Sequence, residues 1–196
     1  MNILDVGGGP GFYCEKLLEN LPNSRVTILD IDDKLLRIAK NRLSNSYYNN
    51  RIAFKKTSVY KTGIKDNTYD FVICRFVLQH LDKPVEAVRE IYRILKPGGI
   101  VAIIYSDSGL MGISDPAFLI KSGRSFFQEL EKRARWNREI GRKLVKILKR
   151  CGFEDLDFEA VTIHSDIIGM NNILKIPKIN DEQIKLLMRC NPNVGK

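Results

Sequence analysis

The sequence predicts a doubly wound α/β fold, in which a mainly parallel β-sheet carries helices on both faces. Short apolar and β-branched runs alternate with amphipathic helical stretches, and the connections between them are short. A glycine cluster, Gly7–Gly11, directly follows the first apolar run. Because ligands of such sheets bind beyond the carboxyl ends of the strands, we expect any site to lie in the loops that follow the strands.

The composition is that of one globular domain. The chain has 196 residues, of which 44% are apolar and 28% are charged. No apolar run approaches the roughly 20 residues that a membrane span needs, and no signal segment opens the chain, so we expect a cytoplasmic protein. Four scattered cysteines without a CxxC pair, and two histidines, favour buried reduced thiols and no metal site.

The first half of the chain supplies five predicted strands and three predicted helices. The helices are expected from apolar stripes that begin at Phe12, Leu35 and Val85. Pro22 ends the first helix and Asp32 caps the second. The composition of residues 96–99 (Lys-Pro-Gly-Gly) predicts a turn, and the five strands are expected at 2–6, 25–31, 52–54, 69–76 and 100–105.

After Ser106 the alternation of strand and helix breaks down. A clear helical stripe returns at Ile140–Cys151, closed by Gly152, and residues 153–163 then alternate like an edge strand. We predict a single domain, 1–196, with a cofactor-binding core, a helical insert on the substrate side, a helix plus edge strand, and a tail. These parts span residues 1–106, 107–138, 139–164 and 165–196.

A strand, a glycine-rich turn and a helix together predict a nucleotide site, because glycines let the backbone approach a ligand at a helix N-terminus. The spacing here is GxGxG, whereas the dinucleotide fingerprint would need glycine at Phe12. Pro10 also removes a backbone donor that a pyrophosphate could use. A nicotinamide or flavin site is therefore disfavoured, although a GxGxG turn without any ligand has the same spacing.

Two acidic residues sit at the ends of predicted strands. Asp30 ends the second strand, where a carboxylate can accept hydrogen bonds from both hydroxyls of a ribose. Asp5 comes just before the glycines and could face an ammonium group. The alternative roles are helix capping for Asp30, for which Asp32 is the better candidate, and a purely structural acid at Asp5.

Four ordered segments resemble motifs of the class I S-adenosylmethionine (SAM)-dependent methyltransferases, of the type found in ubiquinone and menaquinone biosynthesis. Their order and spacing over residues 2–105 are far more specific than any single motif. The segments are Ile3–Gly11 (ILDVGGGPG), Asp66–Val72 (DNTYDFV), Phe76–Leu81 (FVLQHL) and Arg89–Gly99 (REIYRILKPGG).

The resemblance implies a Rossmann-like class I methyltransferase fold with SAM as cofactor. Where many relatives carry an acid that binds the adenine amino group, this chain has Thr57-Ser58-Val59, so Ser58 would be a weaker acceptor and the Val59 N–H would contribute. The remaining implied cofactor contacts are Asp5, Gly7, Gly8, Gly9 and Gly11 at the methionyl end, Asp30 at the ribose, Ile31 on the adenine, and the backbone around Cys74 and Arg75 at the methionyl amine.

Both ends of the chain depart from the family pattern. Relatives usually carry a helical segment before the first strand that closes over the cofactor, whereas Met1 lies four residues before Asp5. The last antiparallel strand of the family is also missing from the predicted elements. We therefore expect a shortened form with an open cofactor site.

Methyl transfer from a sulfonium is an in-line displacement, so positioning can supply much of the acceleration without a dedicated nucleophile or metal. We expect a small-molecule acceptor and a cytoplasmic enzyme. His80 is the candidate general base, although its family position is more often structural, and His164 is expected to be solvated. The side chain of Arg75 is a candidate for binding a carboxylate or phosphate of the substrate.

Two alternatives remain. The chain could be a vestigial SAM-binding module without turnover, or it could modify RNA through residues 131–150, which carry nine basic side chains against two acids and supply most of the net charge of +9. The same window could equally be the solvated face of a helix. Trp136 is its only aromatic residue, which argues against a base-stacking platform; with Phe118, Phe126 and Phe127 it could instead line an apolar pocket.

Overall fold

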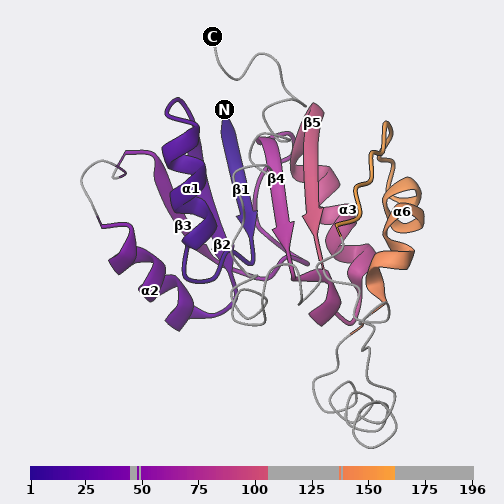
Figure 1. Cartoon of the computed structure of the whole chain (residues 1–196), viewed down its shortest axis with the longest axis horizontal. Helices are drawn as coiled ribbons and strands as arrows, with labels where there is room; N and C mark the ends of the chain where they lie inside the picture. Colours follow the sequence, from indigo (N-terminus) through magenta and orange to yellow (C-terminus); the bar gives the residue numbers. More distant parts are fainter. Residues whose placement is uncertain (45–47, 49, 106–136, 138, 162–196) are drawn as a thin grey trace, which may run out of the picture.

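The computed structural model describes residues 1–44, 48, 50–105, 137 and 139–161. Within them, five strands form one sheet in the order β3-β2-β1-β4-β5, and every neighbouring pair is parallel (Figure 1). All carboxyl ends therefore meet at one edge of the sheet. The strands are β1 (Asn2–Val6), β2 (Arg25–Asp30), β3 (Ile52–Lys56), β4 (Tyr69–Arg75) and β5 (Leu95–Ile104).

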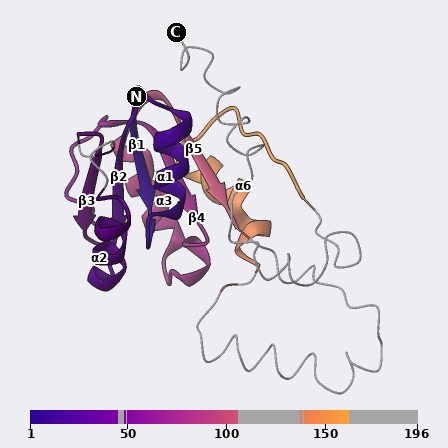
Figure 2. The ribbon, with the colours of Figure 1, turned by 60° about the vertical axis from the view of Figure 1, so that its left-hand side comes forward.

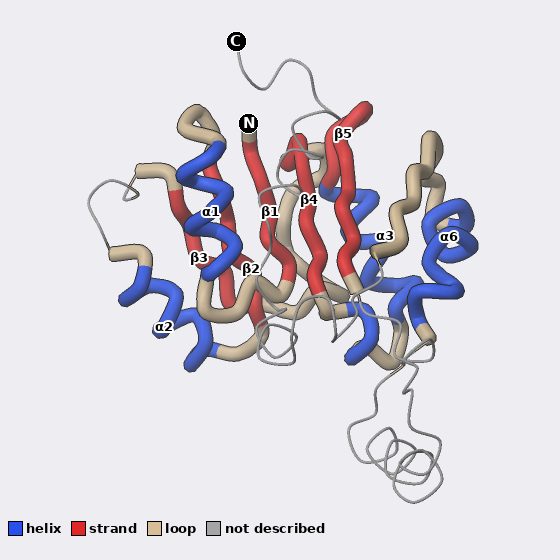
Figure 3. Tube along the Cα trace, viewed as in Figure 1, coloured by secondary structure: helices blue, strands red, loops and turns tan. Residues whose placement is uncertain are grey.

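Helices cover both faces of this sheet, as Figures 2 and 3 show. Helices α1 (Phe12–Asn20) and α2 (Asp33–Arg42) lie on one face, and α3 (Pro84–Ile94) and α6 (Ile140–Arg150) lie on the other. A short 3-10 helix, η1 (Leu78–His80), connects β4 to α3. The doubly wound, parallel α/β class predicted from the sequence is confirmed, as are the helix boundaries set by Pro22 and Asp32, whose carboxylate accepts from the Lys34 N–H.

Each face of the sheet has its own apolar core, because successive side chains of a strand point to opposite faces. In β1, Ile3 belongs to the core under α1 and α2, whereas Leu4 and Val6 belong to the core under α3 and α6. The alternation puts Asp5 on the α1 side, in line with Ile3. A shift of β1 by one residue would therefore move the Asp5 side chain to the α3 face of the sheet.

Ion pairs and hydrogen bonds tie two of the family-like segments to each other at the amino end of the sheet. Asp70 accepts from the backbone N–H of Asn2 at 2.6 Å and from Lys96 Nζ at 2.7 Å. Arg93 pairs with both Asp66 and Glu90. The segments 66–72 and 89–99 therefore hold β1, β4, α3 and β5 together at the amino end of the sheet, whereas the glycine loop lies at the carboxyl end.

Two sequence predictions are corrected. The segment Lys96–Gly99, predicted as a turn, lies inside β5: Tyr69 pairs with Leu95 but Phe71 pairs with Ile100, so the extra residues form an irregular bulge with Gly98 at φ 73°. The edge strand predicted at 153–163 is absent over the described residues 153–161. There Asp155 has a φ of 48°, outside the extended region, and Phe153 packs edge-on against Tyr92 at 4.9 Å instead of joining the sheet.

Helix α6 matches its predicted stripe. Ile140, Leu144 and Ile147 are buried, and the basic side chains Arg142, Lys143, Lys146, Lys149 and Arg150 all face solvent. Within the described ranges, no helix is both long enough and apolar enough to cross a membrane. The cysteines Cys14, Cys74 and Cys151 are free and buried. Cys190, His164, the aromatic residues of the insert and the tail 165–196 lie outside the described residues.

Candidate functional site

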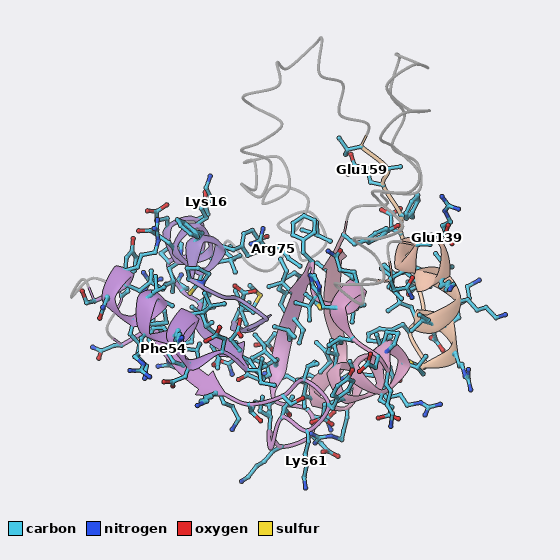
Figure 4. The ribbon with its side chains drawn as sticks, turned by 90° about the horizontal axis from the view of Figure 1, so that it is seen from below. Lys16, Phe54, Lys61, Arg75, Glu139 and Glu159 are labelled. Carbon is cyan, nitrogen blue, oxygen red and sulfur yellow. The ribbon has the colours of Figure 1, made fainter. Side chains whose placement is uncertain are left out.

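The candidate site lies at the carboxyl ends of three adjacent strands, β2, β1 and β4. Figure 4 views this edge and labels Arg75, which ends β4. By the alternation of side chains, Asp30, Asp5 and Arg75 all point to the α1 side of the sheet, following the apolar residues Ile28, Ile3 and Ile73 of the core on that side. Three charged side chains thus form a row at the edge where a ligand of this fold binds.

The glycine loop needs glycine for two separate reasons. Gly7, Gly9 and Gly11 have φ angles of 64°, 52° and 78°, in the left-handed region that other residues rarely adopt. A Cβ on Gly7 would come within 2.3 Å of Val77 Cγ2, and one on Gly8 would come within 2.7 Å of Asp5 Oδ2. The loop therefore passes directly over Asp5 and the segment after β4.

Asp30 is the carboxylate that holds the loop in place. Its Oδ2 accepts from the Gly9 N–H at 2.9 Å, and its Oδ1 accepts from the Asp32 N–H at 2.9 Å. Each oxygen of a carboxylate has a second lone pair, so both remain able to accept from a ligand hydroxyl. The neighbouring Ile31 is 72% exposed, which leaves an apolar surface beside the carboxylate.

Asp5 is a buried acid with an unsatisfied oxygen. The residue is 1% exposed, and its Oδ2 has no hydrogen-bond partner among the described residues. Its pKa is raised to about 7, chiefly by burial. The charge of Arg75 lowers the pKa, and the charge of Asp30 raises it. A buried polar atom without a partner is uncommon in folded proteins and is characteristic of ligand-binding and catalytic positions.

Tyr13 joins this row from α1, although the sequence analysis assigned it no role. Its ring lies 4.7 Å from the Arg75 guanidinium carbon, an arrangement typical of a cation–π contact. The residue is 1% exposed and its hydroxyl oxygen also has no partner within the described part of the chain. Burial, followed by the charge of Asp5, raises the pKa of the phenol. Its place directly after Gly11-Phe12 was the only signal in the sequence.

The other predicted contacts lie around this row. The Thr57 N–H donates to the Asp30 carbonyl at 3.1 Å, which puts the 57–59 segment next to β2. The Ser58 hydroxyl accepts from the Tyr60 N–H at 3.3 Å, so it is already engaged in a local turn, and Val59 is buried in the core on the α3 side. Cys74 is also buried, which raises the pKa of its thiol to about 12 and keeps it neutral.

His80, the candidate base, lies in η1 and not in α3 as predicted. It is exposed, its Nε2 lies 3.4 Å from Gln79 Nε2, and partial burial lowers its pKa. Gln79 accepts from the Asn137 N–H at 2.7 Å through its carbonyl, so the chain returns from the insert directly beside η1. Among the described residues no cluster of three histidine, cysteine or acidic side chains could hold a metal ion.

These features together fit a ligand that carries a nucleoside at one end and a cation at the other. Asp30 offers acceptors for vicinal hydroxyls beside the exposed Ile31, and the buried Oδ2 of Asp5, which has no partner among the described residues, is an acceptor for an ammonium group. The glycine loop brings backbone close to both carboxylates. The loop glycines, Asp5, Asp30 and Arg75 therefore lie along the carboxyl edge of the sheet. The 57–59 segment lies beside the end of β2, and His80 lies in η1 just after β4.

Comparison with known proteins gives a consistent picture. A family model described as a methyltransferase domain matches residues 4–103. The ubiquinone biosynthesis O-methyltransferase of Nitrosospira multiformis is 37% identical over 101 residues, which cover 51% of this chain and 41% of the relative. A ubiquinone/menaquinone biosynthesis C-methyltransferase of Hydrogenovibrio crunogenus is 30% identical over 103 residues, covering 52% of this chain and 41% of the relative. The chain thus spans about two fifths of the length of these curated relatives.

Solved structures show the same fold. A Haemonchus contortus phosphoethanolamine N-methyltransferase in complex with SAM aligns with a TM-score of 0.70 at 21% identity, covering 99% of this chain and 43% of that one. A SAM-dependent methyltransferase of Methanosarcina mazei aligns with a TM-score of 0.63 at 20% identity, covering 80% of this chain and 81% of that one. At these identities the likeness concerns the fold alone.

Proposed function

Because the family model covers half of its residues, this chain belongs to the methyltransferase domain family, and we propose that it transfers a methyl group from SAM to a small-molecule acceptor. The single observation that carries the proposal is the buried Asp5, whose Oδ2 lies under the glycine loop without a hydrogen-bond partner among the described residues. A structural carboxylate would have its oxygens satisfied by the surrounding protein, whereas a cofactor ammonium gives this oxygen the partner that the protein does not.

The cofactor contacts divide among the residues of the row. Asp30 accepts from the ribose hydroxyls, Ile31 packs on the adenine, and Ser58 with the Val59 N–H lies at the adenine edge. Asp5, the loop glycines Gly7, Gly8, Gly9 and Gly11, and the backbone of Cys74 and Arg75 hold the methionyl end. These assignments are supported by the bonds from Gly9 and Asp32 to Asp30, which bring the loop and the ribose acceptor together.

When bound, SAM supplies a methyl group on a positively charged sulfur. The chain's contribution is then to hold the cofactor and the acceptor in line, because a displacement of this kind gains most from orientation. The loop is well suited to that task, since both its glycine conformations and its bonds to Leu29 and Asp30 fix its path. His80 is the one described histidine on this rim and remains the candidate for removing a proton from the acceptor.

A small acceptor is favoured over RNA by the names of the relatives given above. The Asn137 N–H donates to the Gln79 carbonyl, which places Asn137 beside η1, the short helix that contains His80. The relatives named above act in ubiquinone or menaquinone biosynthesis, which suggests hydroquinones as first acceptors to try. The exposed basic side chains of α6 keep the RNA alternative open; it predicts RNA affinity that falls steeply with salt.

The proposal is tested by titrating SAM into the protein by calorimetry and then supplying methyl-tritiated SAM with hydroquinones, phenols and amines. We expect saturable binding and label transfer to one acceptor class, with Asp30→Asn weakening SAM binding about tenfold because a neutral amide replaces a charged acceptor. Absence of SAM binding at millimolar concentration would overturn the proposal. Binding without transfer to any acceptor, including RNA, would favour the vestigial alternative.

A further inference from the structure

Two exposed sets of opposite charge follow each other along the flank formed by α6 and the segment after it. Figure 4 labels Glu139, at the start of α6, and Glu159 on this flank, opposite Lys16 and Phe54. The basic set lies on α6, the acidic set lies on residues 154–159, and every member is exposed. The basic set is Lys143, Lys146, Lys149 and Arg150, and the acidic set is Glu154, Asp155, Asp157 and Glu159.

The charges within each set repel one another. Lys146 and Arg150 are four positions apart on α6, and like charges at this spacing destabilise a helix. Among the described residues, no ion pair joins the basic set to the acidic set, and Glu139 is paired with Arg142. A second molecule that presented opposite charges to both sets would therefore relieve the repulsion in each.

Apolar side chains are exposed on the same two elements. Phe158 is 64% exposed and Val161 is 69% exposed in the segment after α6, and Val145 on α6 itself is 44% exposed. The inward face of α6 is already buried against the core, so Val145 belongs to its outer surface. Apolar side chains that gather on an exposed surface rimmed by charges are typical of a protein–protein contact.

From this arrangement we propose that the flank formed by α6 and residues 153–161 binds the same flank of a second copy of this chain. In a two-fold contact both copies use the same patch, so the basic set of each copy meets the acidic set of the other. The two sets are equal in number and opposite in charge, which makes the patch complementary to itself. The proposal is independent of the proposed function, because Asp5 lies on the α1 side of the sheet and α6 lies on the α3 side.

The acidic set favours a second copy over RNA or an anionic lipid surface. A polyanion drawn to the basic set would also approach the carboxylates of residues 154–159, which follow α6 directly along the chain and would repel it. A second copy meets both sets with the opposite sign. It would also cover Phe158 and Val161, whose burial favours association.

The test reverses charges in pairs and measures self-association of the full chain at low salt by sedimentation velocity. One variant reverses two charges of the basic set, one reverses two charges of the acidic set, and the matched control reverses two exposed lysines between β3 and β4. These variants are Lys146→Glu/Lys149→Glu, Asp157→Lys/Glu159→Lys and Lys61→Glu/Lys65→Glu. We expect the wild type and the control to dimerise alike, and each reversal of a set to raise the dissociation constant at least about 10-fold, because like charges then face each other.

An equimolar mixture of the basic-set and acidic-set variants shows whether the two sets meet each other. In the mixed dimer opposite charges face each other at both contacts, so the dissociation constant should return to within about 3-fold of the wild-type value. Raising the salt to about 0.5 M should weaken the wild-type dimer, because salt screens exposed charges. Recovery in the mixture also establishes that both variants are folded.

Three results would overturn the proposal: a wild type that is monomeric at near-millimolar concentration, reversal variants that dimerise like the wild type, or a mixture that does not recover. RNA and phosphatidylglycerol vesicles are added to the same samples. Binding of either one to a monomeric wild type, lost only in the basic-set variant, would assign α6 to a polyanion instead of a second copy.

Discussion

Two carboxylates on opposite sides of the sheet have opposite surroundings. On the α3 side, Glu90 accepts from the Thr62 N–H at 2.9 Å, from the Thr62 hydroxyl at 2.6 Å and from Arg93. The hydrogen bonds from Arg93, followed by those from Thr62, lower its pKa to about 2. On the α1 side, Asp5 has an oxygen without a partner, and burial raises its pKa to about 7.

The difference distinguishes a carboxylate that stabilises the fold, Glu90, from one that has an acceptor oxygen for a ligand, Asp5. Glu90 stabilises the protein in its ionised form, because the Thr62 N–H, the Thr62 hydroxyl and Arg93 all donate to its carboxylate. Asp5 destabilises the free protein when ionised, and a cation bound beside it would remove that cost. The α3 side therefore serves as scaffold, and the α1 side carries the site.

The largest effect is expected from glycines on the two sides. Gly7, beside Val77 in the segment after β4, and Gly63, next to Thr62, share a φ of 64°. Only Gly7 is crowded: a Cβ there would meet Val77 Cγ2 at 2.3 Å, and nothing lies within 4 Å of one at Gly63. Gly63→Ala should cost about 1 kcal/mol of unfolding free energy through its left-handed conformation, and Gly7→Ala about 2–5 kcal/mol by adding overpacking. Urea denaturation measures both, and equal costs would contradict the crowding.

Replacing Asp5 should alter the pH dependence of stability. Because its folded-state pKa is raised from 3.8 to about 7, its contribution is fully present below pH 3.8 and is lost as the pH rises to about 7. Asp5→Asn cannot titrate, so above pH 7 it should be more stable than the wild type, by up to about 4 kcal/mol, while binding SAM more weakly. Denaturation at pH 4, 6 and 8 checks this; a variant less stable than the wild type at pH 8 would show that the ionised carboxylate is satisfied.

Replacing Glu90 should have the opposite sign. Its folded-state pKa is lowered from 4.5 to about 2, so its contribution is present above pH 4.5 and lost as the pH falls through about 2. Glu90→Gln should cost about 1–3 kcal/mol at pH 7 and little near pH 2. Denaturation at several pH values measures this effect as well. If Glu90→Gln were as stable as the wild type at pH 7, the ionised Glu90 would not stabilise the fold.

The smallest effect is expected at Asp32, which caps α2 beside the site without belonging to it. Its carboxylate accepts from the Lys34 N–H at 2.7 Å, whereas its own backbone N–H donates to Asp30. Asp32→Ala removes only the cap, so it should cost about 1 kcal/mol and leave SAM affinity unchanged. A large loss of SAM affinity in calorimetry would contradict this prediction, because it would mean that the position of Asp30 depends on the Asp32 side chain.

The sequence was sufficient to predict the strands, the glycine loop and the carboxylates at the strand ends, because periodicity and glycine spacing are local signals. It could not predict that Tyr13 would lie under Arg75, since a helical stripe indicates which face is buried but not what packs over it. The composition of Lys96–Gly99 predicts a turn, but these residues form a bulge within β5, because the same residue types suit both structures. Residues 153–161 alternate like a strand, yet they pair with none, since pairing depends on tertiary contacts.

The central claim is that the Asp5 carboxylate binds SAM, whereas the Glu90 carboxylate stabilises the fold. SAM titrations of the wild type, Asp5→Asn and Glu90→Gln by calorimetry at pH 7.5 test it most directly. We predict wild-type affinity for Glu90→Gln and a loss of at least about 10-fold for Asp5→Asn, the cost of a charged hydrogen bond. Equal affinities in the two variants, or no binding by the wild type, would contradict the account.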